Sequence, residues 1–286
     1  MKSTRVFILT LLAIIAFASN SLLCRAALKQ TTVDAATFTF VRVFSGAAAL
    51  WLIVKMRHAS VLANDRHIHG NWLSALALFA YAAAFSFAYV DLSAGTGALL
   101  LFGAVQATMI LWSLHKGERL DAIQIVGSLV AVTGLIVLVF PSLSAPPLIG
   151  SILMLGAGVA WGIYSLRGKG GKNAASATTG NFVRAVPFAA VVSIVFIRWL
   201  RVDIAGVSYA IISGAITSGL GYVIWYRALP GLKAASAATV QLSVPVLAAT
   251  GGILLLCEPL TLRYLLASIA ILGGIALVVL EKNRAL

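Results

Sequence analysis

The tripeptide Phe40-Val41-Arg42 returns as Phe182-Val183-Arg184, 142 positions later, and each copy lies within an apolar stretch of helix length. A second pair, Glu118-Arg119-Leu120 and Glu258-Pro259-Leu260, is separated by 140 positions. The chain has 286 residues, so both spacings are close to half its length. A charge held inside an apolar segment in both copies predicts one membrane unit present twice.

The composition is that of an integral membrane protein. Hydrophobic residues make up 61% of the chain, the mean hydropathy is +1.01, and charged residues are only 10%, against about 25% in soluble domains. The net charge of +13 comes from cations clustered in short loops between apolar stretches. Such loop cations orient a protein in the bilayer, so we expect lipid and not nucleic acid as the partner.

Ten segments are long and apolar enough to cross a bilayer as helices, since about 20 residues span its core. Their polarity does not alternate as it would in barrel strands, so the predicted fold class is an all-α integral membrane protein. The segments are 5–28, 34–55, 71–90, 94–114, 121–140, 147–166, 177–198, 204–226, 234–256 and 261–280.

The N-terminal segment resembles a signal peptide, with basic residues before an apolar run. Its apolar character continues to Leu28, and its removal would leave an odd number of spans. We therefore interpret it as the first transmembrane helix.

The loop charges predict the orientation and the relation between the halves. With the N-terminus inside, 14 Lys and Arg residues fall on the inner side and 5 on the outer side, which predicts that both termini are cytoplasmic. Five spans per half would insert in opposite directions, as in the inverted repeats of secondary transporters. We expect repeats at 1–143 and 144–286, joined by the proline-rich segment 141–147.

Metal, cofactor and enzyme chemistry have little support in the chain. Cys24 and Cys257 are interpreted as apolar fillers of membrane helices, with a disulfide as the open alternative because both are expected near one membrane face. Neither a metal-ligand cluster nor a nucleophile–base pair appears in the sequence. We expect no metal, no cofactor and no enzymatic activity.

The two intramembrane arginines admit two interpretations. Arg42 lies roughly 12 Å into its helix, and Arg184 lies at a mirrored depth in the other half. A cation at such a depth faces a polar cavity or a partner. A contact with the substrate or a gate is one interpretation; a structural role, in capping carbonyls or pairing with a carboxylate, is the other. The duplication itself favours matched gate or structural elements.

All eight carboxylates fall near helix ends, and none lies at mid-membrane. Proton- or sodium-coupled pumps usually carry an acidic group near their central site, so facilitated transport or exchange is favoured. Glu118 and Glu258 are candidate partners for the arginines or for backbone groups at the two ends, with a plain helix-end charge as the alternative.

Aromatic and amide side chains alternate with small residues in the central segments. Such a lining suits a modest organic solute with an apolar part, although an aromatic near a helix end is also a common interfacial anchor. The candidate substrate-binding residues are Asn20, Tyr81, Phe85, Phe102, Gln106, Trp161, Tyr164, Trp225 and Gln241.

The chain resembles the EamA-type ten-helix members of the drug/metabolite transporter superfamily over nearly its whole length. The most specific stretch contains Tyr226-Arg227-Ala228-Leu229, Pro245-Val246 and Glu258-Pro259-Leu260-Thr261. Trp161 is similar to an aromatic that this family often has in helix 6, whereas Ser19-Asn20 departs from the Trp-Gly common in helix 1.

This resemblance implies a bacterial inner-membrane exporter with a central cavity between its halves and a small-molecule substrate. The first expectation is export of amino acids, aromatic or otherwise apolar, as in the similar aromatic amino-acid exporters. Export of drugs or nucleobase-type metabolites, or a non-transporting scaffold role, are the alternatives. The sequence leaves the oligomeric state open, a monomer among the alternatives.

Overall fold

The helices follow the predicted spans closely where the structure describes them; residues 234–239 of the predicted span 234–256 lie outside the described residues. The computed structural model describes residues 2–60, 69–117, 121–140, 145–168, 174–231 and 240–282. Within them, seven helices are long and apolar enough to cross a membrane, and three shorter apolar helices accompany these. The elements are α1 (Lys2–Gln30), α2 (Ala35–Ser60), α3 (Trp72–Ala88), α4 (Ala94–His115), α5 (Ala122–Val139), α6 (Leu148–Gly168), α7 (Ala174–Val195), η1 (Ile197–Trp199), α8 (Ile204–Ile211), η2 (Ile212–Leu220), α9 (Gly221–Ala228), η3 (Leu229–Gly231), α11 (Ser243–Leu256) and α12 (Leu262–Lys282).

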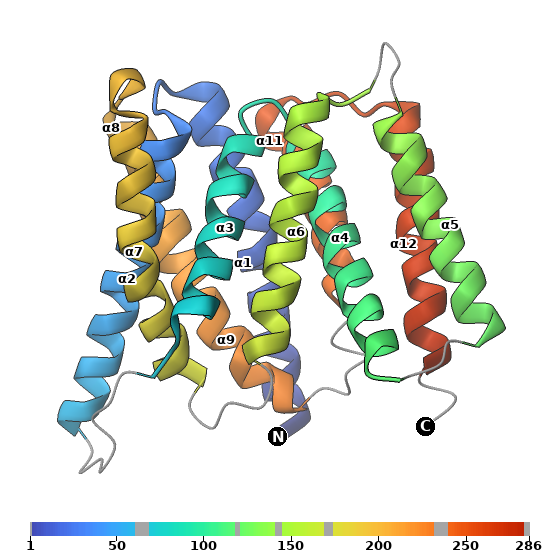
Figure 1. Ribbon diagram of the computed structural model, residues 1–286, viewed down its shortest axis with the longest axis horizontal. Helices are drawn as coiled ribbons and strands as arrows, with labels where there is room; N and C mark the ends of the chain where they lie inside the picture. The colour runs from blue at the N-terminus through green and yellow to red at the C-terminus, as the bar shows by residue number, and fades with distance from the viewer. Residues whose placement is uncertain are drawn as a thin grey trace.

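The predicted all-α class with inverted halves is confirmed by the topology. The start of α1 and the end of α12 lie at one end of the bundle, here called the proximal end, and the opposite end is called the distal end (Figure 1). Helix α1 begins at the proximal end, whereas α6, the first helix of the second half, begins at the distal end (Figure 1). The two halves therefore run in opposite directions.

The packing keeps the same pattern when the halves are exchanged. Helix α1 packs on the continuous segment α8–η2–α9, and its counterpart α6 packs on α3. Likewise α4 packs on α6, and its counterpart α11 packs on α1. Three helices pack directly on their own counterparts: α2 on α7, α4 on α11, and α5 on α12. This exchange symmetry is what an inverted duplication would produce. In Figure 1, α1, α3, α6 and α9 lie towards the middle of the view, with α2 and α7 on one side and α5 and α12 on the other.

Glycines allow the closest helix approaches. A Cβ atom added at Gly127 of α5 would lie 2.6 Å from the carbonyl oxygen of Gly274 in α12, and an added Cβ at Gly274 would clash with the carbonyl of Gly127. Small residues let membrane helices pack at such short range. The outward faces carry exposed Leu, Ile, Val and Phe side chains, as expected for contact with lipid.

The cysteines are free, so the alternative of a disulfide between them is wrong. Cys24 is buried in α1, as expected for an apolar filler. Cys257 is not inside a helix: it caps the C-terminus of α11 in a left-handed conformation, with φ of 51°, and is exposed.

Two aspartates clasp neighbouring connections at the distal end. Asp34 accepts hydrogen bonds from the backbone of Ala36, Thr37 and Arg201 at 2.9, 2.9 and 3.0 Å. Asp203 accepts from the backbone of Gly206 at 2.8 Å and of Thr32 at 3.0 Å. Each carboxylate thus caps its own helix and also holds the connection that precedes the other one.

The clasp formed by Asp34 and Asp203 predicts that the protein loses stability in acid. Burial alone would raise the pKa of Asp34, but the hydrogen bonds it accepts lower it below its usual value. The backbone N–H of Gly206 and further donors lower the pKa of Asp203. Because both pKa values are depressed by folding, the stabilisation is complete above about pH 4 and is lost as the pH falls below it. The thermal unfolding midpoint should fall over this range, and the double variant Asp34→Asn/Asp203→Asn should flatten that dependence; an unchanged slope would contradict the clasp.

Candidate solute-binding site

Arg42 lies in the centre of the helix bundle with its charge buried. Its side chain is only 2% exposed. One terminal nitrogen, Nη2, donates to the hydroxyl of Tyr81 at 3.0 Å, and both Nε and Nη2 lie 3.4 Å from Oγ of Ser218. The guanidinium carbon stands 4.7 Å from the ring centre of Phe85 and 5.3 Å from that of Tyr81. All these partners are neutral.

Asn20 of α1 joins the polar groups around Arg42 into one network. Its amide donates to the hydroxyl of Tyr81 at 3.2 Å, and its carbonyl accepts from Ser213 at 2.6 Å and from Thr217 at 3.2 Å. The network therefore connects α1, α2, α3 and η2. We call it the Arg42 cluster, made of Asn20, Arg42, Tyr81, Ser213, Thr217 and Ser218.

An unusual helical segment places three of these hydroxyls. The nine residues of η2, Ile212–Leu220, form a π-helix within an otherwise α-helical span, and such segments are rare and frequent at functional sites. Gly214 lies against the backbone carbonyl of Arg42, leaving no room for a Cβ. The π-helix and this glycine bring the hydroxyls of η2 within reach of α1 and α2.

Aromatic rings line the same region. Trp161 of α6 is at its middle, with ring centres 4.7 Å from Tyr222, 4.9 Å from Tyr81 and 5.6 Å from Tyr164. Phe17 of α1 lies 5.8 Å from Trp225 and 6.0 Å from Tyr222. We call this set the aromatic wall; its members are Phe17, Tyr81, Phe85, Trp161, Tyr164, Tyr222 and Trp225. Polar groups and flat apolar surfaces are thus adjacent at the centre of the bundle.

Six of the nine candidate substrate-binding residues meet in this region: Asn20, Tyr81, Phe85, Trp161, Tyr164 and Trp225. Two others, Phe102 and Gln106, make no hydrogen bond or ring contact with it among the described residues. Phe102 and Gln106 are buried in α4, and Gln241 is buried just before α11.

Arg184 does not mirror the contacts of Arg42. It is half-buried, and its Nη1 donates 3.0 Å back to the carbonyl of Gly180, one turn earlier in its own helix. Among the described residues, neither arginine pairs with a carboxylate, because the sole ion pair found there joins Arg25 to Glu258. Matched roles for Arg42 and Arg184 are therefore not reflected in their surroundings.

Glu258 forms a latch at the distal end. Its Oε1 accepts from Nε of Arg25 at 3.0 Å, and its Oε2 accepts from the backbone of Ala94 at 2.8 Å. Arg25 also donates to the carbonyls of Tyr89 and Val90, at 3.0 and 2.7 Å. The latch ties α1 to the α3–α4 and α11–α12 connections. Glu118, the corresponding glutamate of the first half, lies outside the described residues.

The latch arginine has its own counterpart in the second half. Arg167 follows Arg25 by 142 positions, the spacing of the Phe-Val-Arg pair. It donates to Ser74 at 3.1 Å and to Asn71 at 3.2 Å, where α3 begins at the proximal end. Corresponding cations thus secure opposite ends of the bundle.

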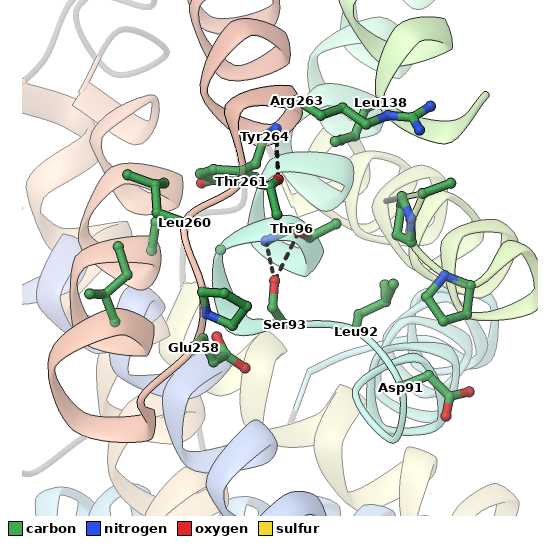
Figure 2. Close-up of a pocket in the computed structure, with 17 residues that line it drawn as sticks. Asp91, Leu92, Ser93, Thr96, Leu138, Glu258, Leu260, Thr261, Arg263 and Tyr264 are labelled. Atoms are coloured by element: carbon green, nitrogen blue, oxygen red, sulfur yellow. Dashed lines mark hydrogen bonds between the residues drawn. The ribbon is translucent and has the colours of Figure 1, made fainter. Parts of the chain in front are cut away.

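A pocket of about 180 Å³ opens beside the latch. Figure 2 shows Asp91 and Ser93 from the α3–α4 connection, and Glu258, Thr261 and Tyr264 from the α11–α12 region, around it. None of its lining residues belongs to the Arg42 cluster, so we treat it as a feature of the distal end and not as the central site.

Comparison with protein families identifies the class of protein. The model of the EamA-like transporter family matches twice, at residues 4–140 and 148–280. The chain belongs to the EamA-like transporter family. Each half of this EamA-like protein thus carries one family unit, and the protein is a multi-pass membrane transporter and not an enzyme.

The relatives of this EamA-like transporter include proteins whose function is not characterised and a solved structure with the same fold. A Pseudomonas aeruginosa protein named as uncharacterised is 54% identical over 282 residues, covering 99% of this chain and 97% of that protein. An uncharacterised transporter of Archaeoglobus fulgidus is 29% identical over 199 residues, 68% of this chain and 70% of its own. A crystal structure described only as that of a protein has a TM-score of 0.66 at 16% identity and covers 98% of this chain and 99% of that one; it shows the fold alone.

Proposed function

We propose that this chain is a secondary transporter of the inner membrane that exports amino acids with aromatic or other apolar side chains, or related small metabolites. The observation that carries the proposal is the buried junction of the Arg42 cluster with the aromatic wall. Polar groups there would fix a solute's orientation, and the rings would hold its apolar part. The positive-inside asymmetry of the loops supports cytoplasmic termini, which would make the distal end periplasmic.

Alternating access suits the arrangement of this site. Arg42, Tyr222 and Trp161 are 2%, 2% and 7% exposed, so the centre is closed to water in this state. The latch and the clasp secure the distal end. A solute would therefore reach the centre only when one end of the bundle separates, and the inverted halves supply two related ways of doing so.

The proposal favours exchange or facilitated transport over tight ion coupling. The aspartates and Glu258 whose side chains are described stand at helix ends or in connections: Asp34, Asp91, Asp121, Asp203 and Glu258. No acidic side chain of the described residues contacts the Arg42 cluster to relay a proton.

Transport into proteoliposomes tests the proposal. Purified protein should carry members of a radiolabelled amino-acid panel faster than empty liposomes do, and phenylalanine or tryptophan should be among them. Uptake should also proceed without an imposed proton gradient. If no solute moves faster than in empty liposomes, with or without such a gradient, the proposed function is wrong.

The wall residue Trp161 gives a narrower prediction. Trp161→Ala should slow transport, because the ring touches Tyr81, Tyr164 and Tyr222 at the centre, whereas Trp161→Phe should keep most of the rate. Both variants should be measured at equal amounts of folded protein, judged by size-exclusion profile. Equal rates for the alanine variant and the wild type would remove Trp161 from the solute's path.

A further inference from the structure

The guanidinium of Arg42 has hydrogen-bond donors that no acceptor contacts in the described part of the chain. Its Nη1 is buried and has no hydrogen-bond partner among the described residues. A guanidinium carries five N–H donors and remains charged in proteins. The hydroxyls of Tyr81 and Ser218 take up the Nη2 and Nε side, which leaves the Nη1 donors free for another group.

Neutral partners do not balance a buried charge. The phenol, the hydroxyl and the two ring faces around Arg42 lower the energy of the cation, but none supplies a negative charge. Removing an ion from water costs several kcal/mol, as an order of magnitude, unless an opposite charge accompanies it. A purely structural guanidinium would be expected to have a carboxylate or carbonyl partner, as Arg25 has in Glu258 and two carbonyls.

A second donor lies in the same region. The hydroxyl of Tyr222 is buried and interacts with that of Tyr81, whose two acceptor sites are taken by Asn20 and Arg42, so the O–H of Tyr222 remains available as a donor. Tyr222 interacts electrostatically with Arg42, and its ring stands 4.7 Å from that of Trp161. The O–H of Tyr222 and the Nη1 donors of Arg42 belong to one water-poor region, and such donors are the groups that bind an anion.

We propose that Arg42 binds a carboxylate of the transported solute, a mono-anion whose aromatic or apolar body lies against the aromatic wall. This inference rests on the proposed transport and names the group by which the solute is recognised. One cation among neutral groups is neutralised by a single negative charge, whereas a phosphate dianion would leave one charge uncompensated. No acidic side chain contacts the cluster in the described residues, so a solute ammonium adds less than the carboxylate.

Binding to the purified full-length protein in detergent tests the inference without requiring transport. The probes are 3-phenylpropionate, its neutral amide 3-phenylpropionamide, phenylalanine and phenyl phosphate. Each probe is titrated into the protein while the tryptophan fluorescence of the protein is recorded. The amide should bind about tenfold or more weakly than the acid, the range expected for losing a charged hydrogen bond. Phenylalanine should bind about as well as the acid, and phenyl phosphate more weakly.

Three variants locate the preference for the acid. In Arg42→Gln the acid and the amide should bind equally within about twofold, and Arg42→Lys should retain part of the difference because it keeps the charge. Arg184→Gln is the matched control, since it removes the corresponding arginine of the other half and should keep the full preference. The wild-type comparison of acid with amide stands even if an Arg42 variant does not fold.

The opposing outcomes are distinct. Equal binding of acid and amide by the wild type, absence of acid binding, tighter binding of phenyl phosphate, or an unchanged preference in Arg42→Gln would each overturn the inference. If the preference is found but no solute crosses proteoliposomes, the anion site stands and the proposed transport fails. If solutes cross but the wild type does not distinguish acid from amide, transport stands and the anion site fails.

Discussion

Gly214→Ala should strongly destabilise the protein and abolish transport. An added Cβ would clash with the backbone carbonyl of Arg42 and with the hydroxyl of Ser45, so η2 and α2 would have to separate. Overpacking costs about 1–3 kcal/mol, occasionally more, and a clash with a backbone atom that cannot rotate away favours the upper end of that range. The separation would also withdraw Ser218 from Arg42 and open the centre of the bundle.

A matched glycine isolates this effect. Gly156 lies in α6 with nothing within 4 Å of its added Cβ, so Gly156→Ala should be neutral or slightly stabilising, by up to about 1 kcal/mol. Thermal unfolding and proteoliposome uptake should be measured for both variants. A Gly214→Ala protein as stable and as active as Gly156→Ala would contradict the close contact of η2 with α2.

Glu258→Gln should release the distal latch. The side chains of Arg25 and Glu258 are 12% and 5% exposed, so the ion pair is largely shielded from solvent. Breaking such a pair by removing one charge costs about 3–5 kcal/mol, and the two carbonyls that still accept from Arg25 favour the lower end of that range. The variant should therefore populate a state with the distal end open.

Opening of the distal end can be measured by the rate at which the thiol of Cys24 reacts. Cys24 is buried one residue before Arg25, so its reaction with a membrane-impermeant maleimide should accelerate in Glu258→Gln, in a Cys257→Ser background. Asp91→Asn is the control, because Asp91 is an exposed carboxylate at the same end (Figure 2), and surface changes of this kind usually stay within about 0.5 kcal/mol. Equal labelling of the Glu258→Gln and Asp91→Asn proteins would exclude the latch as a closure.

The spans and their inversion could be predicted because hydropathy and loop charge are local properties. Each apolar run is constrained by the thickness of the bilayer, and each loop charge by the side on which it lies. The predicted segment 94–114, for example, corresponds to α4 at Ala94–His115. The repeat boundaries at 143 and 144 and the cytoplasmic termini remain predictions.

The contents of the central site were predicted in part. Aromatic and amide residues in apolar spans pointed to Asn20, Tyr81 and Trp161, which do meet. The hydroxyls of Ser213, Thr217 and Ser218 were missed, because they reach the centre only through the π-helix, and helical periodicity with 3.6 residues per turn does not anticipate an i→i+5 segment. The cluster of Ser, Thr and Gly in the middle of an apolar span was the available signal.

The contacts of the charged groups could not be predicted from the sequence repeat. Arg42 and Arg184 occupy corresponding positions, yet one is buried among neutral groups and the other bonds to its own helix. Arg25 is one of the five cations expected on the outer side, and in the structure it is the partner of Glu258. The sequence repeat shows which residues correspond in the two halves. The contacts of each such residue depend on side chains of neighbouring helices, and those side chains differ between the halves.

Solute counterflow in proteoliposomes tests most directly whether this protein moves solutes through the Arg42 centre. Liposomes preloaded with unlabelled phenylalanine should take up labelled phenylalanine transiently above equilibrium when they contain the wild type, since exchange needs no external energy source. The overshoot should be lost in Arg42→Gln and retained in Arg184→Gln. An absent overshoot for every solute of the amino-acid panel, or an undiminished one in Arg42→Gln, would contradict transport through this site.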